Sequence, residues 1–116
     1  MNKTMAGYHI LMILSAVDFR FSPQEDIVIR DYLVQEFPFH VSLDREMHII
    51  SNLKPDEWEQ HYTKVIDDFY DDSTKEDRMK LIDFALQLCK ADNVITKSEN
   101  KYLNMLFDAW EPQDEA

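Results

Sequence analysis

The chain has 116 residues, a net charge of −11, one glycine, four prolines and one cysteine. This length suits one domain with its own core, and the scarcity of glycine and proline disfavours a turn-rich β fold. The acidic balance argues against nucleic acid as a partner because phosphate backbones would be repelled. A lone cysteine excludes an internal disulfide and is typical of a reducing compartment.

The first two predicted helices form a hairpin. Apolar spacing predicts a helix from about Met5 to Val17, and Ser22 followed by Pro23 is a typical helix start, which Pro38 ends. No run reaches the roughly 18 apolar residues that would cross a membrane, so no direct membrane insertion is expected. The expected inner face of the second helix consists of Val28, Ile29, Tyr32, Leu33 and Phe37.

A shorter and a longer helix are predicted in the middle of the chain. Ser42 caps the shorter one, which ends near Leu53, and Pro55 opens the longer one. Asp56 and Glu57 are favourable in the first turn of the longer helix because a helix N-terminus carries partial positive charge. Its expected apolar stripe consists of Trp58, Tyr62, Val65, Ile66 and Phe69.

The last two predicted helices form a second hairpin. Either Ser73 with Glu76 or Thr74 with Asp77 caps a helix that continues to Lys90.

The final helix is expected from Lys97 to about Trp110, and residues 111–116 should form a frayed tail. No segment of convincing length has strand periodicity. The sequence therefore predicts a single all-α domain over 1–116, a compact bundle of about six helices.

The two hairpins, 5–37 and 80–110, repeat the same polarity pattern at an offset of 74 residues, with low identity. The spacing Asp-x3-Ser/Thr-x2-Glu occurs once in each. The matched pairs are Leu14 with Leu88, Ser15 with Cys89, Asp18 with Asp92, Phe21 with Ile95, Ser22 with Thr96, Glu25 with Glu99, Ile29 with Leu103 and Leu33 with Phe107.

The repeated motif has two interpretations. In the first, it is a helix cap: the Ser22 or Thr96 hydroxyl accepts from a backbone N–H of the first turn, and Glu25 or Glu99 reaches back to the cap N–H. This accounts fully for the hydroxyls and the glutamates. It accounts less well for the aspartate that precedes each cap.

In the second interpretation, four carboxylates from the two loops converge on a divalent cation. Packed like charges need a cation or protons to compensate them, and oxygen ligands suit Ca²⁺, Mg²⁺ or Mn²⁺. The candidate ligands are Asp18, Glu25, Asp92 and Glu99.

The segments VDFRFSPQE (17–25) and ADNVITKSE (91–99) resemble the doubled A-D-G-x-I-[ST]-x-x-E signature of the tellurite-resistance TerB-like family. The family's glycine is replaced by Phe19 in the first copy and by Asn93 in the second, and asparagine suits a left-handed turn better than phenylalanine. The resemblance implies a compact helical domain of bacterial, cytoplasmic, stress-response context, related to the N-terminal domain of some membrane-anchored J-domain proteins. It also implies that the four acidic residues of the motif bind a metal.

Enzymatic activity is not expected. The histidines show no i,i+3 or i,i+4 pairing that would form a helical metal motif, and each is expected at the surface or half-buried. Cys89 lies on an apolar face as a small core residue. The four histidines are His9, His40, His48 and His61.

Two functions therefore stay open. The first is a non-enzymatic TerB-like stress-response domain that binds a divalent cation. The alternative is a metal-free adaptor whose acidic surface docks a basic protein partner.

Overall fold

Six α-helices account for the regular structure in the part of the chain that the computed structural model describes, which is residues 3–16, 23–36, 43–90 and 97–110. The helices are α1 (Lys3–Ala16), α2 (Pro23–Glu36), α3 (Leu43–Ser51), α4 (Pro55–Asp71), α5 (Lys75–Lys90) and α6 (Lys97–Trp110). No strand occurs within these ranges, so the predicted all-α bundle of about six helices is confirmed. The Cα radius of gyration is 13.1 Å, the size expected for a packed chain of this length.

The helix boundaries follow the predicted start signals closely. The predicted first residues Pro23, Pro55 and Lys97 are confirmed, and α1 begins at Lys3, two residues before its predicted start. The predicted features that lie outside the described residues include the Ser22, Ser42 and Thr96 caps, Phe37, His40, the side chain of Cys89 and the tail 111–116.

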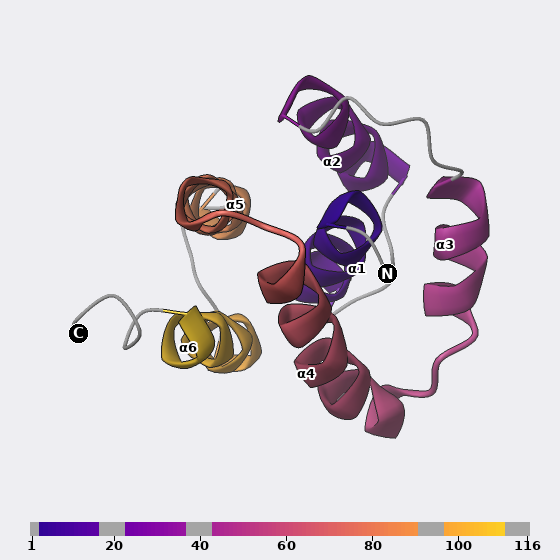
Figure 1. The fold of residues 1–116 in the computed structure, drawn as a ribbon. Coiled ribbons are helices and arrows are strands. Elements are labelled where there is room, and N and C mark those ends of the chain that lie inside the picture. The colour runs from indigo at the N-terminus through magenta and orange to yellow at the C-terminus, as the bar shows by residue number, and fades with distance from the viewer. Residues whose placement is uncertain (1–2, 17–22, 37–42, 91–96, 111–116) are drawn as a thin grey trace.

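α1 is the central helix of the bundle and contacts each of the other five helices. Figure 1 shows it in the middle, with α2, α3 and α4 arranged around it. All of its residues after Met5 are buried except Ser15, because its side chains are mostly apolar on every face and no face suits water. Within the described ranges, no helix combines the length and apolar character needed to cross a membrane.

Gly7 lets three helices pack closely against the backbone of α1. A Cβ atom at this position would lie 3.3 Å from Leu33 Cδ2 of α2, 3.4 Å from Phe69 Cε2 of α4 and 3.6 Å from Leu81 Cδ1 of α5. The chain's one glycine therefore sits where side chains from α2, α4 and α5 meet α1.

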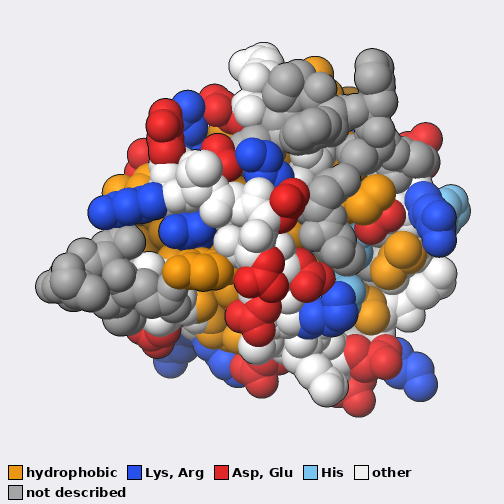
Figure 2. All heavy atoms as spheres, in the orientation of Figure 1, with side chains coloured by type: hydrophobic (Ala, Val, Ile, Leu, Met, Phe, Trp, Pro, Cys, Tyr) orange, Lys and Arg blue, Asp and Glu red, His pale blue; other side chains and the backbone are white. Residues whose placement is uncertain are grey.

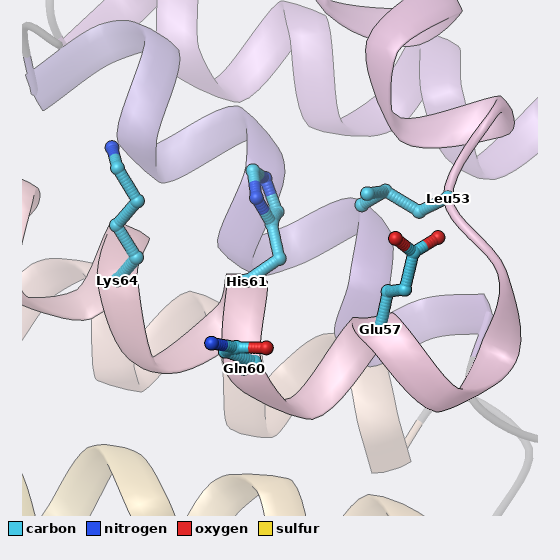
Figure 3. Close-up of a pocket in the computed structure, with 5 residues that line it drawn as sticks. All are labelled: Leu53, Glu57, Gln60, His61 and Lys64. Atoms are coloured by element: carbon cyan, nitrogen blue, oxygen red, sulfur yellow. The ribbon is translucent and has the colours of Figure 1, made fainter.

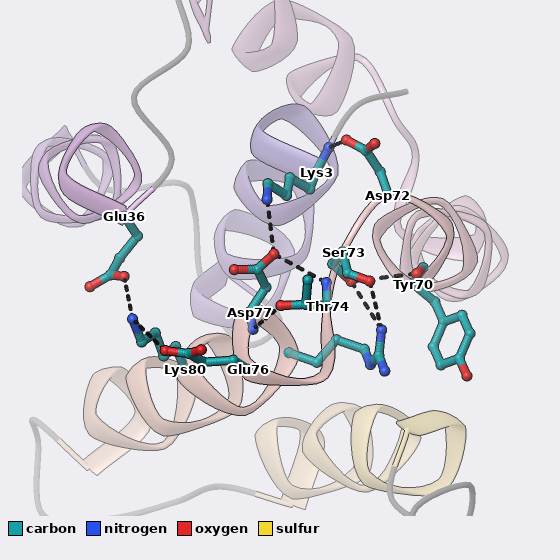
Figure 4. Close-up of polar contacts among 10 residues, drawn as sticks. Lys3, Glu36, Tyr70, Asp72, Ser73, Thr74, Glu76, Asp77 and Lys80 are labelled. Carbon is teal, nitrogen blue, oxygen red and sulfur yellow. Dashed lines mark hydrogen bonds and ion pairs between the residues drawn. The ribbon is translucent and has the colours of Figure 1, made fainter.

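The turn between α4 and α5 also holds the start of α1 (Figure 4). Thr74 and Asp77 form the predicted capping box, with the Asp77 N–H donating to Thr74 Oγ1 and the Thr74 N–H to Asp77 Oδ2, both at 3.1 Å. The Lys3 ammonium donates to the same Asp77 carboxylate at 2.8 Å, and the Lys3 backbone N–H donates to Asp72 at 2.9 Å. One carboxylate thus caps α5 and anchors α1.

α2 is an outer helix that buries only a narrow face. Ile29 and Leu33 are fully buried, and Tyr32 stacks on Phe84 of α5 with ring centroids 4.0 Å apart. The prediction that Val28 belongs to this inner face is wrong, because 49% of the residue is exposed. Consecutive helical residues point about 100° apart, so a strip that buries Ile29 turns its neighbour outward.

α6 covers α4 and α5 on the other side of the bundle. The Tyr62 hydroxyl of α4 donates to the backbone oxygen of Tyr102 at 3.1 Å, and Trp110 stacks on Phe69 with centroids 5.3 Å apart. The buried residues of α6 are Tyr102, Leu103, Leu106 and Trp110.

Candidate functional site

The acidic residues of the repeated motif are only partly within the described structure. Glu25 and Glu99 are each the third residue of their helix, α2 and α6, as a capping box requires. Asp18 and Asp92 lie outside the described residues, as does the side chain of Glu25. Glu99 is half-buried in the first turn of α6. Whether the four carboxylates converge therefore stays a prediction.

A different polar cluster lies in the interior, where α1, α3 and α4 meet. His9 Nε2 lies 2.7 Å from Glu46 Oε1, and His9 Nδ1 lies 2.8 Å from His61 Nε2. His9 is fully buried, the Glu46 side chain is 5% exposed and His61 is half-buried. The prediction that each histidine lies at the surface or half-buried is therefore wrong for His9. We call these three residues the histidine chain.

Hydrogen-bonding capacity fixes how protons are arranged along the histidine chain. A Glu46 carboxylate only accepts, so His9 must donate from Nε2. In neutral His9 the lone pair is then on Nδ1, and His61 Nε2 must donate to it. Every polar atom between the two rings and the carboxylate is then paired, as a buried network requires.

Burial is the main influence on both histidines. Burial lowers the pKa of His9, and the hydrogen bond and charge of Glu46 partly oppose that shift. The pKa of His61 is also lowered, first by burial and then by the charges of His9 and Lys64. Both rings therefore favour the neutral form more strongly than an exposed histidine does.

His61 connects the buried chain to a surface groove of about 330 Å³. Figure 3 shows His61 and Lys64 extending on the same side of α4, with Glu57 one turn before His61. Glu57 accepts a hydrogen bond from the Lys54 backbone N–H at 2.8 Å, so it also caps α4. The groove is lined by Leu53, Glu57, Gln60, His61 and Lys64. This lining offers a proton carrier but no hydroxyl or thiol nucleophile.

A second polar network, next to the histidine chain, is fully paired. The Tyr8 hydroxyl donates to Asp26 at 2.6 Å, and Arg30 donates to Asp26 at 2.8 Å and to Asp44 at 2.7 Å. Burial, together with Asp26, raises the pKa of the Tyr8 phenol. This network joins α1, α2 and α3 and is accounted for by that structural role alone.

No metal site is assembled among the described side chains. Within residues 3–16, 23–36, 43–90 and 97–110, no three His, Cys, Asp or Glu side chains are placed to hold one ion. In the histidine chain the two partners lie on opposite nitrogens of His9, so the three side chains do not converge on one point.

The outer face of α2 carries apolar residues in water. Ile27 is 60% exposed and Val34 is 62% exposed, with the exposed Asp31 between them on the same face and Val28 beside them. We call Ile27, Val28, Asp31 and Val34 the α2 face.

The repeat shows that the α2 face is unusual. At the offset of 74 residues, Ile27 and Val34 correspond to Lys101 and Asp108 of α6, which are both exposed charged residues. At these two positions the residue is apolar in α2 and charged in α6, whereas Val28 and Asp31 correspond to Tyr102 and Met105.

The surface around these features is strongly acidic. α4 alone carries six carboxylates against one lysine, and Figure 2 shows acidic side chains gathered over α4 in the centre of the face drawn there. In α2, four carboxylates accompany one arginine. A basic ligand would approach either helix favourably.

Comparisons with known proteins identify no relative of this chain. No family model matches the chain, and neither the curated proteins nor the solved structures give a significant match. The resemblance to the TerB-like family therefore rests on the two motif segments.

Proposed function

We propose that the protein is a non-enzymatic helical interaction domain that binds a basic protein partner through the α2 face. The single observation that carries this proposal is the pair Ile27 and Val34, about 60% exposed at positions where α6 has charged residues. Exposed apolar residues that gather on one helix face are typical of a partner-binding surface.

Charge selects the kind of partner. Asp31 lies between the two apolar residues, and the chain carries a net charge of −11. A basic amphipathic helix fits best, because its apolar face would cover Ile27 and Val34 while a lysine or arginine pairs with Asp31. Covering each apolar side chain contributes about 1.5–3 kcal/mol at most.

The proposal is tested by titrating the protein with a synthetic leucine–lysine amphipathic helical peptide. The double variant Ile27→Lys/Val34→Asp keeps the net charge unchanged and should weaken binding by about tenfold or more. The matched control is Met79→Ser on α5, which removes another apolar residue that is 52% exposed, and it should leave the affinity unchanged.

An equal loss of peptide affinity in the double variant and in Met79→Ser would overturn the proposal, because binding would then not be specific to the α2 face. So would an affinity that does not fall between about 0.05 M and about 0.5 M salt, since exposed charge pairs are screened over that range. Analytical sedimentation of the protein without peptide then measures its oligomeric state. A dimer that the double variant abolishes would assign the α2 face to a second copy of this chain.

A second candidate function is the binding of Ca²⁺, Mg²⁺ or Mn²⁺ by Asp18, Glu25, Asp92 and Glu99. The observation that favours it is the equal placement of Glu25 and Glu99, each third in its helix and each seven residues after an aspartate. This role would agree with the cytoplasmic stress-response context that the TerB-like resemblance implies.

Calorimetric titration with each cation separates a metal site from a helix cap. Asp92→Asn/Glu99→Gln should abolish the heat of binding, whereas Thr96→Ala should lower the free energy of unfolding by about 1 kcal/mol and keep the heat. No heat from the unaltered protein would remove this candidate.

A further inference from the structure

We propose that the histidine chain Glu46–His9–His61 is a proton-sensitive lock between α1, α3 and α4, which accepts one added proton and is broken by a second. This inference is independent of the α2 face. It rests on the two hydrogen bonds of 2.7 and 2.8 Å and on the full burial of His9.

The first added proton can be held without loss of a hydrogen bond. It enters at His61 Nδ1, the ring nitrogen that the chain does not use. The proton on His61 Nε2 then passes to His9 Nδ1, and the N–H···N bond between the rings reverses its direction. His9 becomes an imidazolium next to the Glu46 carboxylate, and His61 stays neutral with its proton on Nδ1.

The second added proton cannot be held in this geometry. With both rings as imidazolium, His9 Nδ1 and His61 Nε2 would each carry a proton and face each other at 2.8 Å. Two donors form no hydrogen bond, and two positive charges repel. The contact between the rings must then open.

His61 is the ring that can move, because it borders the groove while His9 is enclosed. Glu57 lies one turn earlier on the same face of α4, so its carboxylate is placed to receive the charged ring. Glu57 would then divide its hydrogen bonding between His61 and the Lys54 N–H at the start of α4.

The surroundings of His9 contain charges of both signs. From α4, Lys64 opposes protonation of His9 and Asp68 favours it, and the two side chains pair with each other at 2.8 Å. From α3, Glu46 favours protonation.

Charged side chains of α2 and α5 that contact α1 do so at other residues. Asp26 and Arg30 bond to Tyr8, and Asp77 bonds to Lys3. The charged groups that most influence His9 therefore come from α3 and α4.

The sign of the pH dependence follows from the lowered pKa of both rings in the folded protein. The unfolded chain takes up protons near the ordinary histidine value of about 6.5, before the folded chain does. The stability that the lock contributes is therefore complete above about pH 6.5 and decreases as pH falls below that value. Each proton that the unfolded chain binds in excess of the folded chain raises the unfolding constant by up to about tenfold per pH unit.

The test compares urea unfolding at about pH 7.5 and about pH 5.5 in three proteins. His61→Gln keeps an N–H near the position of Nε2 but cannot be protonated. His48→Gln removes an exposed histidine of α3 and serves as the matched control. Between the two pH values, the unfolding constant of the unaltered protein should rise about tenfold more than that of His61→Gln, and as much as that of His48→Gln.

Equal pH dependence in all three proteins would overturn the proposal. If His61→Gln fails to fold, the ring-nitrogen NMR signals of the unaltered protein decide the question. The signals of His9 and His61 should change together and at a pH below the ordinary histidine value. Independent titration of His9 and His61 near pH 6.5 would overturn the proposal as well.

Discussion

The two hairpins of the repeat occupy very different environments in the folded protein. α1 is enclosed by five helices, whereas α5, its counterpart at an offset of 74 residues, buries mainly Leu81 and Ala85. The second helices differ in the opposite sense, because α6 buries four large or apolar residues and carries charges outside, while α2 exposes Ile27, Val28 and Val34.

The repeated motif therefore specifies where a helix begins but not how much of that helix is covered by its neighbours. Both copies are followed by a helix at the same spacing, at Pro23 and at Lys97. Burial is decided afterwards by how many neighbours each helix meets. Variants placed at equivalent positions of the two hairpins can therefore test the comparison directly.

The largest effect is expected from Leu14→Ala compared with its equivalent, Leu88→Ala. Leu14 is fully buried in α1, so its truncation should lower the free energy of unfolding by about 2–5 kcal/mol. Leu88 is half-buried in α5, so Leu88→Ala should lower the free energy of unfolding by only about 1–2 kcal/mol. Urea unfolding of both variants measures the difference, and equal losses would contradict the central position of α1.

A smaller effect is expected from Gly7→Leu, which places in α1 the residue found at the equivalent position, Leu81. The new side chain would collide with Leu33 and Phe69, whose atoms lie within 3.4 Å of the Cβ position. Overpacking of this kind costs about 1–3 kcal/mol. Thermal unfolding measures this loss of stability. An unchanged midpoint temperature would show that α2 and α4 can move away from α1 to make room for the new side chain.

The cap that α5 shares with α1 should have a moderate effect. Thr74→Ala removes the hydroxyl that accepts from the Asp77 N–H and should cost about 1 kcal/mol. Ser73→Ala is the control, because its hydroxyl makes only long hydrogen bonds: it donates to the Tyr70 oxygen over 3.5 Å and accepts from Arg78 over 3.4 Å.

The same cap also has a pH signature. Partial burial raises the pKa of the Asp77 carboxyl, but hydrogen bonds from Lys3 and Thr74 outweigh this effect and hold the pKa below its usual value. This contribution to stability is therefore present above about pH 4 and is lost as pH falls further. Acid unfolding of Thr74→Ala should begin at higher pH than that of Ser73→Ala.

The smallest effect is expected on the α2 face. Ile27→Lys and Val34→Asp give α2 the residues of α6, and each should change the free energy of unfolding by less than about 0.5 kcal/mol. Ile29→Lys, two residues after Ile27 on the buried face, should instead unfold the domain. A large loss at Ile27 or Val34 would show that these residues stabilise the fold instead of binding a partner.

The sequence allowed the helices to be predicted because their signals are local. Prolines at first helical positions, capping residues and apolar spacing each act within a few residues, so the starts at Pro23, Pro55 and Lys97 were recognisable. The placement of Glu25 and Glu99 in first turns followed from the same signals.

The histidine chain was missed because its members are far apart in the sequence. His9 is separated from Glu46 by 37 residues and from His61 by 52, so a search for i,i+3 and i,i+4 pairs cannot find it. One signal was present: a titratable residue inside an otherwise apolar run needs a buried polar partner. The outward turn of Val28 was missed because helical spacing alone does not show how wide the covered face is.

The central position of α1 has a consequence for protein synthesis. The last residue of α4 is made 55 residues after the last residue of α1 (71 − 16), which corresponds to about 3–11 s at about 5–20 residues per second. Throughout that interval the nascent chain carries a mostly apolar segment that lacks its main neighbour. The yield of folded protein in a cell should therefore depend on chaperones that bind the first helix during translation.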